Sequence, residues 1–224
     1  MKDSDENIDS TDSVPERLLR AAKQFFLSDE YHQVSTRRIA EAAGVNTAMI
    51  RYYFGSKEGL YEEMIRAALM PILEALDSEA LTTRQGYIDY LRTYYRTMSA
   101  TPELPKLMFK VVALSQGPGQ RFVQQLLERG QKRGARRLNE MKQSGQLDAG
   151  LDPDVLRMAF TSLAVMPMLL KENFEAQMER PMDEAFLDRL AHFNGEMFAQ
   201  ALSAALGAAT ANAMGKPTDE TPTA

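Results

Sequence analysis

Apolar residues recur every three or four positions along most of the chain, which is the spacing of helices with one buried face. This pattern predicts a helix starting at Ser13, a short helix from Ser35, a third from Asn46 and a fourth from Ser56 to about residue 80. Further helices are predicted at about 84–99, 104–115, 119–143, 153–174 and 183–208. No stretch shows sustained strand alternation bounded by hairpin turns. We therefore expect an all-α protein.

The predicted helix ends have the side chains that cap helices. Ser13 is followed three residues later by Glu16, which is the spacing of a capping box. Ser35 and Asn46 can each accept a hydrogen bond from backbone N–H groups that a first helical turn leaves free. Gly44 suits the left-handed position that ends a helix. Two short helices joined by a tight turn thus follow a longer helix, as in a helix-turn-helix.

Prolines are expected to bend two of the longer helices. Pro71 lies inside the fourth helix and Pro167 inside the helix predicted at 153–174. Each proline removes a backbone hydrogen bond and crowds the preceding turn, so each position predicts a kink.

The two ends of the chain differ in composition from the rest. Residues 1–13 hold five acidic residues against Lys2, so they account for −4 of the formal net charge of −5. Both 1–13 and 209–224 are polar and are predicted to be disordered. Between them we predict a helix-turn-helix domain at 14–58 and a larger helical domain at 59–208. Net charge therefore does not exclude a polyanionic partner, because DNA binding depends on local basic faces.

The third helix, within NTAMIRYYFGSK, is expected to present two faces. Val45 and Ile50 have the spacing of a hydrophobic staple and, with Phe54, point inward. The outward residues are small, hydrogen-bonding or cationic, which suits a helix in the major groove: Thr47, Ala48, Arg51 and Tyr52. Spacing alone leaves an alternative open. In an ordinary three-helix bundle the two tyrosines would be core aromatics and Lys57 a solvated charge.

The residue identities in this segment point to one protein family more specifically than the spacing of its apolar residues does. VSTRRIAEAAGVNTAMIRYYFGSKEGLYEEMI resembles the DNA-binding segment of the TetR family of bacterial transcription regulators. The matching positions are Ser35/Thr36, Arg37, Ile39-Ala40, Ala43-Gly44-Val45, Tyr53-Phe54 and Ser56-Lys57-Glu58. The resemblance is dense over residues 14 to about 66. It implies a helix-turn-helix module joined to a larger helical ligand-binding and dimerisation domain.

The resemblance also implies roles for single positions. Residues matching Thr47, Ala48 and Met49 approach base edges in the family, and those matching Tyr52, Tyr53 and Lys57 hold phosphates. Arg51 departs from the family pattern, where many members have tyrosine. It could read a guanine edge or take a phosphate, and we favour the phosphate.

Residues near the start of the second helix suit phosphate binding on chemical grounds. Ser35 and Thr36 combine hydroxyls with free amides at a helix N-terminus. Arg37 and Arg38 are adjacent and cannot share one helix face, so one is free for phosphate while the other pairs with Glu41 or stays solvated.

The larger helical part is rich in methionine and tyrosine, which fill irregular space and are found mainly in ordinary cores. In the TetR family the corresponding domain binds a small effector, and the resemblance is the reason for expecting a pocket here. The candidate lining residues are Tyr87, Tyr94, Met98, Met108, Phe109, Val112, Phe122, Leu126, Met158 and Ser162. We expect a largely apolar effector.

The segment from Lys106 to Lys142 is basic, with nine lysines and arginines against Glu128 and Glu140. Two interpretations are open. The charges could attract an anionic effector, such as a coenzyme A ester. They could equally form a solvated face, which we favour because they spread around the helix.

The last two predicted helices have two apolar faces each, more than one core contact requires. This suggests a four-helix interface with a second copy, for which the candidates are Leu156, Phe160, Leu163, Phe186, Leu190, Phe193 and Met197. A symmetric dimer would explain recognition of a palindromic operator.

Other classes of protein fit the sequence poorly. The two histidines, His32 and His192, are not at metal-ligand spacing, and cysteine is absent, so we expect no metal, no cofactor and no enzyme. No apolar run is long enough for a membrane span and no signal peptide is evident, so we expect a cytoplasmic protein. We expect a repressor released from DNA by an effector. The alternative is an effector-independent nucleoid or architectural protein.

Overall fold

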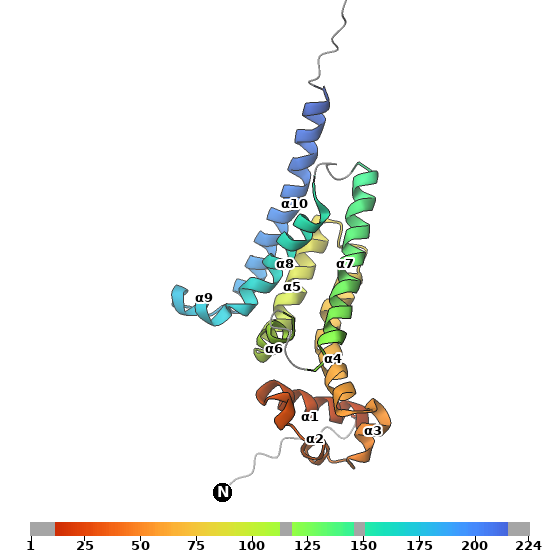
Figure 1. Cartoon of the computed structure of the whole chain (residues 1–224). Coiled ribbons are helices and arrows are strands. Elements are labelled where there is room, and N and C mark those ends of the chain that lie inside the picture. The colour runs from red at the N-terminus through yellow and green to blue at the C-terminus, as the bar shows by residue number, and fades with distance from the viewer. Residues whose placement is uncertain (1–11, 113–117, 146–150, 215–224) are drawn as a thin grey trace, which may run out of the picture. The chain divides into compact units, whose positions relative to one another are not determined.

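A computed structural model describes residues 12–112, 118–145 and 151–214, with side chains up to residue 202. These residues form ten α-helices and one 3-10 turn and contain no strand, so the all-α prediction is confirmed (Figure 1). The helices are α1 (Val14–Ser28), α2 (Thr36–Ala42), α3 (Ala48–Phe54), α4 (Lys57–Asp77), α5 (Arg84–Ser99), α6 (Glu103–Val112), α7 (Gln120–Gln143), α8 (Pro153–Leu169), α9 (Lys171–Met178) and α10 (Glu184–Met214), with the turn η1 (Tyr31–Gln33) between α1 and α2.

The helices divide into two compact units. The first contains the described residues up to Met70 together with 106–124, and the second contains 71–105 and the described residues from Gln125 onward. Pro71, where we expected a bend, lies inside α4 at the boundary between the units. Each unit is described separately below.

The predicted caps of the first unit are confirmed. The Ser13 amide and hydroxyl both donate to Glu16 Oε2, at 2.8 and 2.7 Å, which completes the capping box of α1. Ser35 Oγ accepts from the Arg38 amide at 3.1 Å, and Asn46 Oδ1 accepts from the Ala48 amide at 2.8 Å. Gly44 has a φ of +63°, a conformation that side chains with a Cβ rarely adopt.

Tertiary packing stabilises α2 and α3, because seven residues are too few for a helix to be stable alone. Leu18 and Ala22 of α1, Ile39 of α2 and Ile50 of α3 are all buried. The three helices pack against one another, which fixes the orientation of α3. The outward face of α3 is therefore set by the core beneath it.

In the second unit, α5 packs along α10 and also against α8. Tyr95 of α5 is fully buried, and its hydroxyl donates to the carbonyl oxygen of Leu163 at 2.6 Å. The same hydroxyl accepts from Asn194 Nδ2 at 2.9 Å, so one buried polar group links α5, α8 and α10. A buried hydroxyl with both partners specifies how these helices meet.

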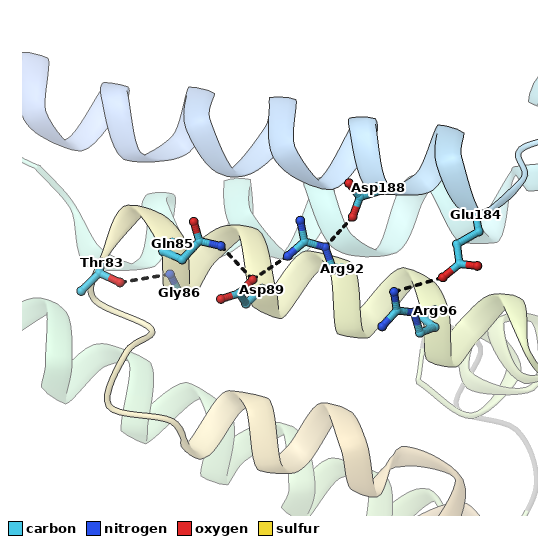
Figure 2. A network of polar contacts seen from close by, with 8 residues as sticks. All are labelled: Thr83, Gln85, Gly86, Asp89, Arg92, Arg96, Glu184 and Asp188. Carbon is cyan, nitrogen blue, oxygen red and sulfur yellow. Dashed lines mark hydrogen bonds and ion pairs between the residues drawn. The ribbon is translucent and has the colours of Figure 1, made fainter.

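The exposed edge between α5 and α10 has a ladder of ion pairs (Figure 2). Arg92 donates to Asp89 at 2.7 Å within α5 and to Asp188 of α10 at 2.5 Å. Arg96 donates to Glu184 at 3.1 Å. Arg84 pairs with Glu196, two residues that Figure 2 does not draw as sticks. Each pair joins a residue further along α5 to one earlier in α10, as antiparallel helices require.

The prediction of a single helix at 153–174 is wrong in one respect, because the structure has two helices there. α8 ends at Leu169 and α9 begins at Lys171, with a bend of 68° between them. Pro167 lacks an amide hydrogen and crowds the preceding turn, which favours a break at this place. Within the described ranges, no single helix is long and apolar enough to cross a membrane; only the bent pair α8 and α9 passes that test, as a pair.

The last helix is longer than predicted. α10 continues to Met214, so residues 209–214, which we expected to be disordered, are helical. The sequence there is rich in alanine, the residue with the highest helix propensity. The remainder of the two predicted tails, residues 1–11 and 215–224, lies outside the described residues.

Candidate DNA-binding surface

A hollow of about 430 Å³ lies where the beginnings of α2, α3 and α4 meet. Its lining residues are Thr36, Thr47, Ala48, Ile50, Arg51, Gly55, Ser56 and Lys57. Five predicted DNA contacts are therefore brought together: Thr36, Thr47, Ala48, Arg51 and Lys57. The other five predicted contacts lie outside this lining: Ser35, Arg37, Met49, Tyr52 and Tyr53.

The residues of α3 divide between core and surface as the helical spacing predicted. Ile50 is buried and Phe54 is half-buried. Tyr52 is 76% exposed and Tyr53 is 44% exposed, and their rings meet edge to face with centroids 4.8 Å apart. The alternative in which both tyrosines are core aromatics does not hold, because both hydroxyl-bearing rings are at the surface.

The three arginines near this surface differ in their partners. Arg37 donates to Glu41 at 2.8 Å, which raises the arginine's pKa through the hydrogen bond and the carboxylate charge. Arg38 donates to Asp29 at 2.7 Å and lies over the Phe25 ring at 4.3 Å. Among the side chains that the structure describes, none pairs with the Arg51 guanidinium. Arg51 is exposed and has its hydrogen-bond donors available to a ligand.

Lys57, at the start of α4, has partners that the sequence did not suggest. Its Nζ donates to the carbonyl oxygen of Tyr31 at 2.5 Å and lies 4.1 Å from the centre of the Tyr31 ring. Partial burial lowers the pKa of this lysine from its ordinary value. No local signal in the sequence pointed to this contact, because 26 residues separate the two positions.

Gly55 and Ser56 also line the hollow, and they shape the turn between α3 and α4. Gly55 has a φ of +74°, and its amide donates to the Arg51 carbonyl at 3.1 Å. Ser56 Oγ accepts from the Gly59 amide at 3.0 Å, as expected of a helix cap. This turn sets the position of Lys57 relative to α3.

The predicted effector-pocket residues are divided between the two units. Met108, Phe109, Val112 and Phe122 belong to the first unit, and Tyr87, Tyr94, Met98, Leu126, Met158 and Ser162 belong to the second. Tyr87 and Met98 are buried, whereas Met158 is 61% exposed on α8 and Ser162 is also exposed. A common pocket for these residues stays a prediction.

The predicted interface residues also differ in exposure. Leu156 is buried in a cluster with Tyr87 and Phe198, and Phe160 and Leu163 pack against that cluster. Phe186 and Leu190 are half-buried. Phe193 and Met197 are 64% and 43% exposed, so α10 has large apolar side chains at the surface of the single chain.

Several charges of the basic 106–142 segment have partners within the protein. Lys110 donates to Glu30 at 2.5 Å, and Arg133 pairs with Asp77. Arg137 donates to the carbonyl oxygens of Leu76 and Asp77 at 3.0 and 3.1 Å, which satisfies the C-terminal end of α4. Because these charges already have partners, they favour the interpretation of the segment as a solvated face over its interpretation as a site for an anionic effector.

The sequence of the DNA-binding module and the fold both match known regulators. Residues 18–64 match the model of the family described as bacterial regulatory proteins, tetR family. A comparison with curated proteins found no match. Among solved structures, a Mesorhizobium loti protein described as a TetR-family transcriptional regulator shares 22% identity over 84% of this chain and 96% of its own, with a TM-score of 0.55.

Two further solved structures share the fold. The transcriptional regulator FadR of Bacillus subtilis, in complex with stearoyl-CoA, is 17% identical over 82% of this chain and 97% of its own, with a TM-score of 0.62. The flavonoid-responsive regulator FrrA is 23% identical over 84% of this chain and 96% of its own, with a TM-score of 0.57. The helix-turn-helix segment of this chain thus matches the TetR family of bacterial regulatory proteins, as the sequence resemblance predicted, and these solved regulators share the fold of the chain.

Proposed function

We propose that this regulator represses transcription as a homodimer on a palindromic operator and is released by a small, largely apolar effector. The observation that carries the DNA-binding part is the surface of α3. An exposed arginine without a partner among the described side chains, two exposed tyrosines and a hollow lined by hydroxyl groups lie together on this short helix and its flanks. Tyrosine and hydroxyl side chains bind phosphate oxygens, and arginine binds phosphates or guanine edges.

Exposed apolar side chains on α8 and α10 support the dimer. Val155 and Met158 of α8 are 62% and 61% exposed, and Phe193 and Met197 of α10 are also exposed. Large exposed apolar side chains at helical spacing on two packed helices are characteristic of interfaces between copies. Of the predicted interface residues, Phe193 and Met197 are the best placed, and Val155 and Met158 extend the same proposal to α8.

The effector is proposed from the fold and from its relatives. The Bacillus subtilis regulator was solved with stearoyl-CoA, and FrrA is flavonoid-responsive. In this chain α5 has Tyr87, Tyr90 and Tyr94 in aromatic contact with each other or with Phe160. Aromatic and apolar residues of this kind line sites for apolar ligands. An effector can release DNA only if it binds one state of the dimer better than the other.

Selection of genomic fragments by the full-length protein, followed by sequencing, tests this proposal. A repressor with an operator should enrich a few palindromic sites, whereas an architectural protein should enrich many unrelated sequences. The enriched site then serves as a fluorescent probe, with stearoyl-CoA and a set of flavonoids added separately. Loss of binding with either compound supports effector release. A protein that enriches many unrelated sequences and ignores both compounds would favour the architectural alternative.

A further inference from the structure

The turn η1 and the two residues before it make four contacts with their surroundings, all within the first unit. Asp29, before the turn, accepts from Arg38 of α2 at 2.7 Å. Glu30 accepts from Lys110 of α6 at 2.5 Å, and this hydrogen bond and charge hold the pKa of Glu30 below its usual value. The Tyr31 ring stacks on Phe26, with centroids 5.5 Å apart, and meets Tyr61 edge to face at 5.2 Å. The position of Tyr31 is therefore fixed from α1, α2, α4 and α6.

The Lys57 ammonium is bound to this fixed turn in two ways. One N–H donates to the Tyr31 carbonyl, and the cation lies over the face of the Tyr31 ring at 4.1 Å. An ammonium has three donors, so two directions remain after the carbonyl is satisfied. Lys57 also lines the hollow next to Arg51 and Thr47. The Lys57 ammonium, which the turn holds, is thus one of the groups expected to contact DNA.

Holding a lysine in place changes the free energy of a phosphate contact. A free lysine side chain has a large rotamer entropy, and part of it is lost when the ammonium binds one phosphate. A lysine that is already ordered loses less on binding, which favours the complex without any new contact to DNA.

We propose that Tyr31 is a positioning residue for the Lys57 ammonium in DNA binding, and that the Glu30–Lys110 ion pair holds Tyr31 in the position this requires. The inference rests on the proposed DNA-binding function. It assigns a role to residues of η1 and α6 that do not belong to the helix-turn-helix itself.

A double-mutant cycle tests the role of Tyr31. DNA affinity is measured by fluorescence anisotropy over a range of salt concentrations for the wild type, Tyr31→Leu, Lys57→Ala and the double variant. Lys57→Ala should weaken binding to all sequences and reduce the salt slope by about one. Tyr31→Leu should weaken binding about three- to tenfold with the slope unchanged, because the charge of Lys57 stays while the aromatic ring that holds it is lost. In the double variant Tyr31→Leu should add nothing.

Tyr31→Phe is the matched control, because it keeps the ring that Tyr31→Leu removes, while the backbone carbonyl is present in both variants, and it should bind DNA like the wild type. An equal effect of Tyr31→Leu with and without Lys57 would overturn the proposal and show a role in packing alone. If Tyr31→Leu shows no thermal unfolding transition, this variant is not folded, and the DNA affinity of Glu30→Ala tests the proposal instead. Removing a negative charge should strengthen DNA binding by simple electrostatics, whereas loss of positioning should weaken it. Stronger or unchanged binding would overturn the proposal.

A measurement without DNA separates this inference from the proposed function. In carbon-13 NMR spectra, the Lys57 ε-methylene, assigned through its loss in Lys57→Ala, should be shifted by the Tyr31 ring current. That shift should persist in Tyr31→Phe and vanish in Tyr31→Leu. An unshifted signal in the wild type would show that the lysine is not held by the ring. A wild-type protein with the shifted signal but no affinity for any DNA would contradict the proposed function alone.

Discussion

Gly195 of α10 lies against Ile88 of α5 so closely that a Cβ at position 195 would be 2.6 Å from Ile88 Cγ1 and 2.9 Å from its backbone nitrogen. Real Cβ atoms do not come this near to other heavy atoms, so alanine here forces the two helices apart. Overpacking costs about 1–3 kcal/mol and the gain in helix propensity offsets up to about 1 kcal/mol. We expect Gly195→Ala to reduce the free energy of unfolding by about 1–2 kcal/mol, measured by urea denaturation at fixed protein concentration.

The control for this change is Gly134→Ala on α7. A Cβ at Gly134 would have no neighbour within 4 Å, so only the propensity gain remains. This variant should be unchanged or more stable by up to about 1 kcal/mol. Equal stability of the two alanine variants would contradict the close approach of α5 and α10.

The ion pair between Arg92 and Asp188 predicts a pH dependence of stability. The hydrogen bond from Arg92 lowers the pKa of Asp188 below its usual value. A carboxyl with a lower pKa in the folded state stabilises the fold above its unfolded pKa of about 4 and loses this contribution as pH falls through the folded pKa. We expect Asp188→Asn to melt at a lower temperature than the wild type near neutral pH. The difference in melting temperature should shrink toward zero in acid, and a difference independent of pH would count against this contribution.

Arg51 is expected to contact a phosphate, because its guanidinium has no partner among the described side chains and it lines the same hollow as Lys57. Arg51→Ala should weaken binding to all sequences about equally and reduce the salt slope by about one. The measurement is affinity for the operator and for each single-base-pair variant of it. Loss of preference at one base pair only, worth about 1–3 kcal/mol, would show instead that Arg51 reads a base.

Phe193 tests the proposed dimer, because an aspartate in its place would put a charge into an apolar interface. Phe193→Asp should sediment as a monomer in analytical ultracentrifugation and lose affinity for a full palindrome more than for a half-site. Leu127→Asp is a matched control, because Leu127 is half-exposed and lies on α7, which contains none of the proposed interface residues. A Phe193→Asp protein that stays dimeric would remove α10 from the interface.

The sequence by itself determined the helical class and most helix boundaries, because caps and helical periodicity are local signals. Ser13 with Glu16, Ser35 and Asn46 form the predicted hydrogen bonds, and Ile50 faces the core as its spacing required. The family resemblance was also readable, since it depends on residues that are close together in the chain. Local signals failed where composition was misleading: an alanine-rich end continued α10, and one predicted helix broke after Pro167.

Only the tertiary structure decided which polar groups are already engaged. Arg38 and Arg51 look alike in the sequence, but Arg38 pairs with Asp29 at the end of α1 while Arg51 has no partner among the described side chains. Lys57 meets Tyr31 across 26 residues, and Arg92 meets Asp188 across 96. The physical reason is that such pairings depend on how separate helices pack, and helical periodicity says which face a residue is on but not which residue lies opposite.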